Sequence, residues 1–193
     1  MSNKIDIKIQ IIEKAALIFS QNGYEKTSMN QIAAAVEMAK SSLYYYFESK
    51  NEIFKKVVEY EANELNGKIS QALENQSNPL DKIRIYVLSR LHYFMNYPNL
   101  YKALKSERLQ SIDFIKDFRH SYYQNEIEQF KTIIDEGVTT NLFSIYDSEL
   151  AATAIITAIK GMETPLFINN LARNVETTVR DAVSIILYGI VKR

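Results

Sequence analysis

Residues 28–50 read SMNQIAAAVEMAKSSLYYYFESK, a pattern of two short helices separated by a tight turn. The first helix starts with a capping box, because the Ser28 hydroxyl can accept from the first turn and Gln31 can reach back. Its apolar side chains recur at helical spacing: Met29, Ile32, Ala33 and Val36. The turn falls at Glu37-Met38, and the second helix is expected from about Ala39 to Phe47. This layout predicts a helix-turn-helix, whose second helix enters the DNA major groove.

The second helix divides into a buried face and a polar face. Leu43 and Phe47 lie four residues apart on one side, which predicts that they face the core. Serines and a lysine can contact base edges, and tyrosine hydroxyls can donate to phosphates. Alternatively, the tyrosine rings are half-buried in the packing while their hydroxyls face solvent. The sequence leaves both interpretations open. The polar face comprises Lys40, Ser41, Ser42, Tyr44, Tyr45 and Tyr46.

Composition narrows the function classes. The 193 residues carry equal numbers of acidic and basic side chains, so any DNA-binding face must be local. Cysteine is absent and only two histidines occur, without a phosphate-binding glycine loop or a metal-spaced cluster. We therefore expect no enzyme, no catalytic residue, no metal and no cofactor. Without an apolar run of about 18 residues, we expect a cytoplasmic protein with no membrane partner.

Few helix breakers, five Gly and three Pro, predict an all-α fold of about nine helices. The first helix is expected to end at Asn22. Near the start of the chain isoleucines alternate as in a strand, which conflicts with the helical spacing that follows. The first few residues are therefore either part of the helix or a flexible arm before it. The division into domains is expected near Lys50, giving a helix-turn-helix domain over 1–50 and a second domain over 51–193. The next helix is expected to start near Asn51. Five more are expected over Leu80–Tyr97, Pro98–Leu109, Phe114–Gly137, Asp147–Glu163 and Val175–Lys192. Gly137 is expected to cap the C-terminal end of its helix.

The segment Ile9–Leu65, about the first third of the chain, resembles the N-terminal domain of the tetracycline-repressor (TetR) family. The matching positions are Ala15-Ala16, Phe19, Gly23-Tyr24, Thr27-Ser28, Ile32-Ala33, Leu43-Tyr44-Tyr45-Tyr46-Phe47 and Lys50. Four positions depart from the family pattern. Glu37 replaces the usual turn glycine, Ala39 replaces a capping Ser or Thr, Ser41 stands where Gly is frequent, and Tyr46 stands where His is common.

The resemblance implies a transcriptional regulator, with a helical bundle behind the head for ligand binding and dimerisation. It implies that Lys40, Ser41 and Ser42 face bases of double-stranded DNA. The other DNA contacts that it implies are Ser28, Tyr44, Tyr46 and Lys50 at phosphates, with Asn30 and Tyr45 at the groove edge. It also implies a homodimer through the last two helices, reading a near-palindromic operator. The residues leave repressor versus activator open, and a repressor released by a small molecule is the interpretation adopted here.

Charge and hydropathy add two expectations. Residues 1–50 hold six lysines and five acidic residues, a net charge of +1, so the salt dependence of DNA binding should be modest. The final helix is apolar around most of its circumference, more than a monomer needs, which favours burial against a second subunit. A helical adaptor protein would explain that helix too, but would leave the match over residues 28–50 unexplained.

The second domain is where a small-molecule effector would bind, between helices of a bundle. Its many apolar positions favour a hydrophobic or amphipathic effector. An aromatic or Met side chain at helical spacing is more often plain core than a ligand contact; His120 fits a hydrogen-bonded core histidine better, and Arg90 could bind an anionic group or reach solvent. The candidate contacts are Tyr86, Arg90, Tyr93, Phe94, Tyr97, His120, Tyr123, Met162 and Phe167.

Overall fold

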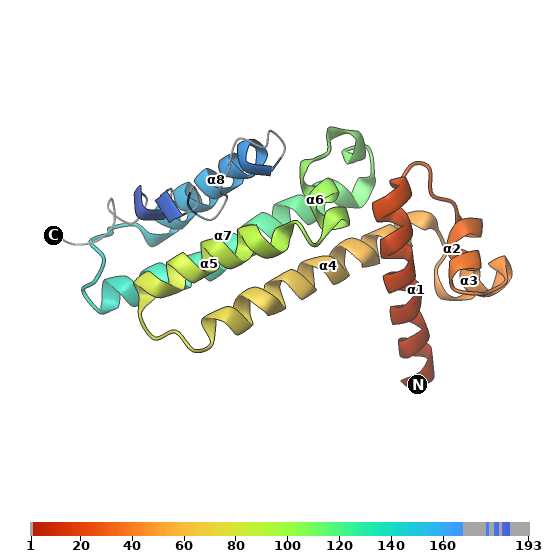
Figure 1. Ribbon diagram of the computed structural model, residues 1–193, viewed down its shortest axis with the longest axis horizontal. Helices are drawn as coiled ribbons and strands as arrows, with labels where there is room; N and C mark the ends of the chain where they lie inside the picture. Colours follow the sequence, from red (N-terminus) through yellow and green to blue (C-terminus); the bar gives the residue numbers. More distant parts are fainter. Residues whose placement is uncertain (1, 168–176, 178–179, 182, 186–193) are drawn as a thin grey trace. The chain divides into compact units, whose positions relative to one another are not determined.

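The computed structural model describes residues 2–167, 177, 180–181 and 183–185, and within them the fold is all-α, as expected. No β-strand occurs in these ranges, and no helix in them is both long and apolar enough to cross a membrane. The elements, shown in Figure 1, are α1 (Ser2–Asn22), α2 (Met29–Ala35), α3 (Lys40–Tyr46), α4 (Lys50–Leu73), α5 (Pro79–Phe94), α6 (Pro98–Lys105), the 3-10 helix η1 (Glu107–Leu109), α7 (Asp113–Thr139) and α8 (Ser148–Phe167). The expected helix over Val175–Lys192 lies largely outside the described residues.

The chain forms two compact units. The first unit combines residues 1–65 with residues 95–117, so α6 and η1 belong with α1, α2, α3 and the start of α4. The second unit combines residues 66–94 with the chain from residue 118 onward. The boundary near Lys50 expected from the sequence separates a proposed DNA-binding domain from a proposed ligand-binding domain, and it stays a proposal.

An aromatic cluster forms the centre of the first unit. The rings of Phe19 and Phe54 meet edge-on at 5.0 Å, and Tyr24 lies 4.8 Å from Phe54. Helix α1 is helical from Ser2, so its first residues are not an arm. The isoleucines that alternate as in a strand lie on this helix, so the strand signal is wrong. Only Ile11 among them is fully buried.

Both ends of α2 are capped. Ser28 Oγ accepts from the backbone N–H of Gln31 at 3.3 Å, and Gln31 Oε1 accepts from the N–H of Ser28 at 2.8 Å, which confirms the capping box. At the other end Glu37 is left-handed, with φ of 55°. The N–H of Met38 donates to Ala33 O and that of Glu37 to Ala34 O, which is a Schellman motif with Glu37 where Gly is usual.

A buried carboxylate ties α6 to the rest of the first unit. Glu61 Oε2 accepts from the backbone N–H of Leu100 at 2.7 Å, and Oε1 accepts from Asn99 Nδ2 at 2.6 Å. The same amide nitrogen also donates to Ala16 O at 2.9 Å. Helices α1, α4 and α6 are therefore joined through two side chains that are almost fully buried.

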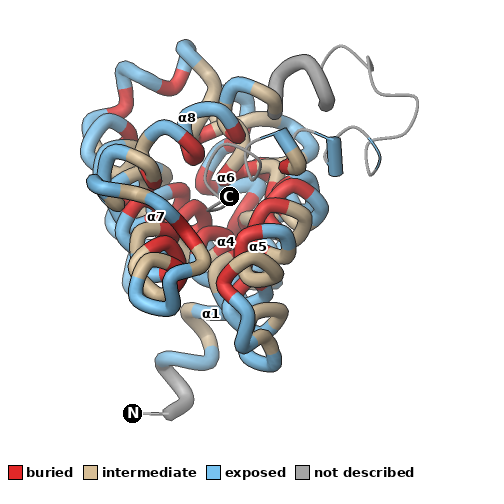
Figure 2. The backbone as a smooth tube through the Cα atoms, turned by 90° about the vertical axis from the view of Figure 1, so that its left-hand side faces the viewer, coloured by how far each residue is buried: buried red, intermediate tan, exposed pale blue. Residues whose placement is uncertain are grey.

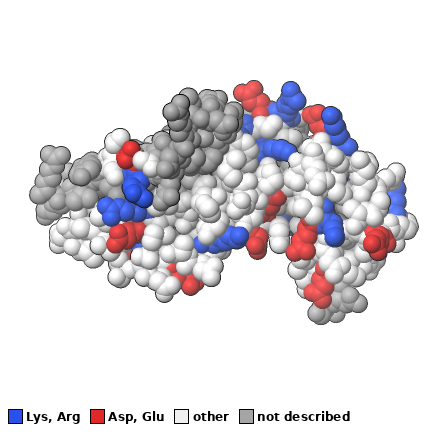
Figure 3. Space-filling view, viewed as in Figure 1, with Lys and Arg blue, Asp and Glu red and all other residues white. Residues whose placement is uncertain are grey.

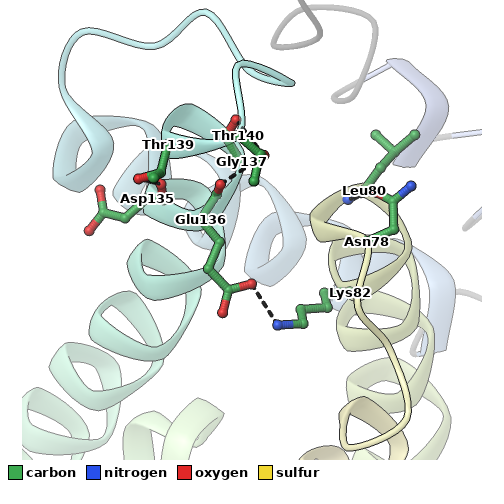
Figure 4. A network of polar contacts seen from close by, with 8 residues as sticks. All are labelled: Asn78, Leu80, Lys82, Asp135, Glu136, Gly137, Thr139 and Thr140. Atoms are coloured by element: carbon green, nitrogen blue, oxygen red, sulfur yellow. Dashed lines mark hydrogen bonds and ion pairs between the residues drawn. The ribbon is translucent and has the colours of Figure 1, made fainter.

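Helices α5 and α7 carry the core of the second unit, and their buried positions recur along each helix as red segments in Figure 2. Tyr86 on α5 meets Phe130 on α7 edge-on, with ring centres 5.1 Å apart. Nearer the start of α5, Lys82 pairs with Glu136 at 2.5 Å. Figure 4 shows this pair beside the last turn of α7, where Thr140 Oγ1 donates to Glu136 O at 2.9 Å.

The expectation that Gly137 caps its helix is wrong. Helix α7 continues to Thr139, and the left-handed residue is Asn141, with φ of 57°. Gly137 is needed for another reason: a Cβ there would lie 2.0 Å from Cδ2 of Phe143. The absent side chain lets the chain turn back and place a buried aromatic ring against the helix.

Candidate nucleic-acid interface

Helix α3, the candidate recognition helix, is anchored by the two side chains predicted to be buried. Leu43 is fully buried and Phe47, at the C-cap, is 1% exposed. Its N-cap is Ala39, which provides no side-chain hydrogen bond, as its residue type predicts. The position of α3 therefore depends on these two apolar contacts and on the Schellman turn before it.

The polar face of α3 is open to solvent. Lys40, Ser41 and Ser42 are exposed in its first turn. Tyr44 is 44% exposed and Tyr45 is 70% exposed, so packing alone does not account for either. Tyr46 is half-buried, and its ring meets that of Tyr45 edge-on at 5.2 Å. The packing interpretation therefore remains open for Tyr46 only.

The remaining candidates lie on α2 and at the start of α4. Asn30 is exposed in the first turn of α2, and the exposed Ser28 already serves as its cap. Lys50 is half-buried: its ammonium donates to Tyr24 O at 2.9 Å and lies 4.3 Å from the centre of the Tyr24 ring. Lys50 therefore holds the loop before α2, and a phosphate contact by Lys50 stays a prediction.

One basic residue close to α3 was not among the candidates. The ammonium of Lys8, on α1, lies 5.2 Å from the centre of the Phe47 ring. Helical periodicity within α1 could not reveal this neighbour, because the contact joins residues far apart in sequence. Charges of both signs are interspersed on the face seen in Figure 3, in keeping with the equal numbers of acidic and basic residues in the chain.

Three of the effector candidates lie together in the second unit, all buried on α5: Tyr86, Arg90 and Phe94. Arg90 pairs with Glu126 through two hydrogen bonds, one from Nε to Oε1 and one of 3.2 Å to Oε2. The guanidinium also lies 5.2 Å from the centre of the Phe94 ring. Arg90 therefore does not reach solvent. Glu126 was missed as its partner, because sequence spacing says nothing about contacts between different helices.

The environment of Tyr86 keeps its hydroxyl neutral. Burial, followed by the nearby carboxylate of Glu126, raises the pKa of Tyr86 above its ordinary value, whereas Arg90 acts in the opposite direction. The phenol therefore stays neutral to a higher pH than an ordinary tyrosine does.

The other effector candidates are dispersed. Tyr97 belongs to the first unit. His120 is exposed, so its expected place in the core is wrong; it lies on the outer side of α7. Tyr123 joins α7 to α8 through a 2.7 Å hydrogen bond to Thr157. Tyr93 and Met162 are half-buried, and the side chain of Phe167 lies outside the described residues.

The sequence matches the family described as "Bacterial regulatory proteins, tetR family" over residues 11–57. It is 35% identical over 89 residues to the biofilm operon icaADBC HTH-type negative transcriptional regulator IcaR of Staphylococcus aureus strain Newman, covering 46% of this chain. The match spans only 44% of that relative.

Two solved structures extend the likeness along the chain. A transcriptional regulator from Cytophaga hutchinsonii is 28% identical, with a TM-score of 0.77 over 95% of this chain and 97% of that one. A TetR transcriptional regulator from Chloroflexus aurantiacus covers all of both chains at a TM-score of 0.80 and 18% identity, which shows a shared fold. Residues 11–57 are thus similar to the bacterial regulatory proteins of the tetR family, and the chain shares the fold of the two solved regulators.

Proposed function

We propose that this protein is a ligand-responsive repressor that binds a near-palindromic operator and leaves it when a small molecule binds. The observation that carries the proposal is the open polar face of α3, held in place by buried Leu43 and Phe47. A short helix with an anchored apolar side and an exposed row of Lys, Ser and Tyr side chains suits insertion into a major groove.

The roles of the side chains follow from their chemistry. Lys40, Ser41 and Ser42, in the first turn of α3, are suited to base edges, and Lys can donate to guanine acceptors. Tyr44 and Tyr46 would donate to phosphates, which set the register without reading sequence. In this proposal Ser28 and Lys50 also contact phosphates, while Asn30 and Tyr45 lie at the groove edge.

A homodimer supplies the second recognition helix. Helix α8 exposes Leu150, which is 65% accessible, together with Ala154, Ala158 and Gly161 on the same side. Small side chains allow a partner helix to approach closely, and an apolar exposed stripe favours such a partner. Paired through the last two helices, the two heads would read half-sites about 34 Å apart, or a multiple of that distance.

The effector would bind in the second domain, residues 51–193. Its buried set of Tyr86, Arg90 and Phe94 with Glu126 combines aromatic surface with a charged pair and a neutral phenol. Such a setting suits a hydrophobic or amphipathic ligand with one polar end. A ligand that prefers one spacing of the heads, while the operator prefers another, would release the DNA.

Repression is supported by the relative named above, which is described as a negative transcriptional regulator. That likeness covers less than half of either chain, so the genes controlled here and the effector are separate questions.

The test is selection of bound sequences from a random duplex pool, followed by a screen for metabolites that release the enriched DNA. We expect an enriched near-palindrome whose retention is lost with a triple Lys40→Ala, Ser41→Ala, Ser42→Ala variant. A matched triple variant of exposed residues on α4, Lys55→Ala, Lys56→Ala, Asn63→Ala, should keep it. If no sequence is enriched, the regulator proposal fails and a helical adaptor becomes the better description.

A further inference from the structure

A cavity of about 230 Å³ lies within the first unit, and its lining includes none of the buried set on α5. Its walls come from the end of α1 and the loop that follows it, from α4, and from α6 with η1. Two aromatic rings, Phe19 and Phe54, provide an apolar floor. The cavity is smaller than the roughly 300–1,000 Å³ typical of sites for drug-sized ligands, so it suits a small molecule.

The rim of this cavity is positively charged. Lys26, Lys102 and Arg108 line it, and Glu25 is the one acidic residue among its described lining, so the lining carries a net charge of +2. Lys102 donates to Ser20 O at 3.0 Å, which uses one of the three protons of its ammonium. Lys26 and Arg108 are exposed. An anionic group entering the cavity would meet cations from separate segments of the chain.

The cavity wall also contains a buried acceptor that lacks a donor. Asn99 is 1% exposed and lines the cavity. Its amide nitrogen uses both protons, on Ala16 O and Glu61 Oε1, which fixes the orientation of the amide. Oδ1 accepts no hydrogen bond from any residue that the structure describes. Buried polar atoms are nearly always paired, so Oδ1 is an acceptor that a donor from a bound molecule could satisfy by reaching past the lining.

We propose that this cavity binds a small organic carboxylate that also carries a hydroxyl or amino donor. The carboxylate would lie between Lys26 and Arg108, because charge-assisted hydrogen bonds to a carboxylate are strong. The apolar part would rest on the rings of Phe19 and Phe54, and the donor would satisfy Asn99 Oδ1. This site shares no residue with the effector site proposed around Tyr86, Arg90 and Phe94.

The position of the cavity connects it to the helix-turn-helix. Its wall includes the loop before α2, and the same loop accepts hydrogen bonds from Lys50 at Tyr24 O and, at 3.4 Å, Glu25 O. A ligand in the cavity therefore contacts the segment that sets where α2 begins. We expect the ligand to change operator affinity by about fivefold or more, the lower end of typical couplings. This expectation rests on the proposed DNA-binding function.

Binding is tested on the full chain with 4-hydroxybenzoate as the probe. Calorimetry gives its affinity, and amide NMR shifts locate it, with Gly23 and Arg108 as reporters. We expect benzoate, which lacks the donor, and 4-hydroxybenzamide, which lacks the charge, to bind more weakly. The variant Lys26→Gln, Arg108→Gln should lose about tenfold in affinity, since both cations are solvent-exposed and each contributes modestly.

The matched control is Lys55→Gln, Arg84→Gln, which removes the same charges from exposed positions outside the cavity. It should bind the probe as the native chain does. No binding by any of the three compounds, shifts that map elsewhere, or equal loss in the control would overturn the site. Equal affinity for benzoate would overturn the role of Asn99.

The link to DNA is measured separately, as operator affinity with and without the probe. An unchanged operator affinity with the cavity occupied would overturn the coupling alone. If the chain binds no operator, the proposed function fails, and the calorimetry still decides whether the site exists.

Discussion

The carboxylate of Glu61, on α4, accepts a 2.7 Å hydrogen bond from the backbone N–H of Leu100 in the first turn of α6. The side chain is 5% exposed, and burial raises the pKa of Glu61, although the hydrogen bonds from Leu100 and Asn99 oppose that shift. One acidic group thus caps a helix and carries a desolvation cost at the same time.

This relationship predicts a pH-dependent stability. Because the folded pKa of Glu61 lies above its unfolded value near 4.5, the folded state holds the proton more tightly. The contribution of Glu61 is therefore fully present below pH 4.5 and is lost as the pH rises through the folded pKa. Urea titrations across this range should show the fall in unfolding free energy. Glu61→Gln should remove it, whereas the exposed Glu64→Gln should keep it; identical pH profiles in both variants would refute this assignment.

Replacing Glu37 by glycine should stabilise the first unit. A side chain at φ of 55° costs about 1–2 kcal/mol, and the extra freedom of glycine in the unfolded chain takes back part of that gain. We expect a net gain of about 0.5–1 kcal/mol in the unfolding free energy, measured by thermal or urea denaturation. Glu37→Ala keeps the strained Cβ and should show no such gain. A gain of the same size with alanine would mean that the charge, and not the backbone, was responsible.

Gly137→Ala should destabilise the second unit. The added methyl would lie 2.0 Å from a ring carbon of Phe143, which is 3% exposed and has little room to move. Overpacking of this kind costs about 1–3 kcal/mol, seen as a lower denaturation midpoint. Gly67→Ala is the control, because nothing lies within 4 Å of a Cβ at that exposed helical position. It should stabilise the chain by about 1 kcal/mol; two equal losses would contradict the steric explanation.

The double variant Tyr44→Phe, Tyr46→Phe should weaken binding to all DNA sites alike. It removes only hydroxyls, and contacts to phosphates carry no sequence information. Affinities for the selected operator and for a scrambled duplex should fall by the same factor in a binding titration. A shift in sequence preference at unchanged affinity would show instead that these tyrosines read bases.

The salt dependence of operator binding should be shallow. Residues 1–50 carry a net charge of +1, so few phosphates can be neutralised by each subunit. Each neutralised phosphate adds about −0.9 to the slope of log affinity against log salt concentration. A titration in potassium chloride that gave a slope near −10, as steep as that of a strongly basic repressor, would rule out this contact set.

Local sequence rules succeeded where one short segment contains all the interacting groups. The capping box of Ser28 and Gln31, the missing cap at Ala39 and the burial of Leu43 and Phe47 were all predictable, because their determinants lie within four residues. The same rules placed the turn at Glu37, whose left-handed backbone the structure confirms.

The same rules failed where distant segments meet. Glycine is the usual residue type at a helix C-terminal cap, yet Gly137 is required because of the ring of Phe143. His120 follows an apolar spacing but faces outward, because spacing alone does not say which side of α7 is covered. Arg90 could not be assigned a partner, since Glu126 is 36 residues away on another helix.

By itself, the sequence determined the helical class, the helix-turn-helix over residues 28–50 and the family resemblance, since these depend on periodicity, capping and side-chain type. Only the tertiary structure decided which helices share buried polar groups. It places α6 in the same unit as α1 and the start of α4, with Glu61 and Asn99 between them, and it pairs Arg90 with Glu126. The physical reason is that burial of a polar group demands a partner, and the partner is set by packing in space and not by distance along the chain.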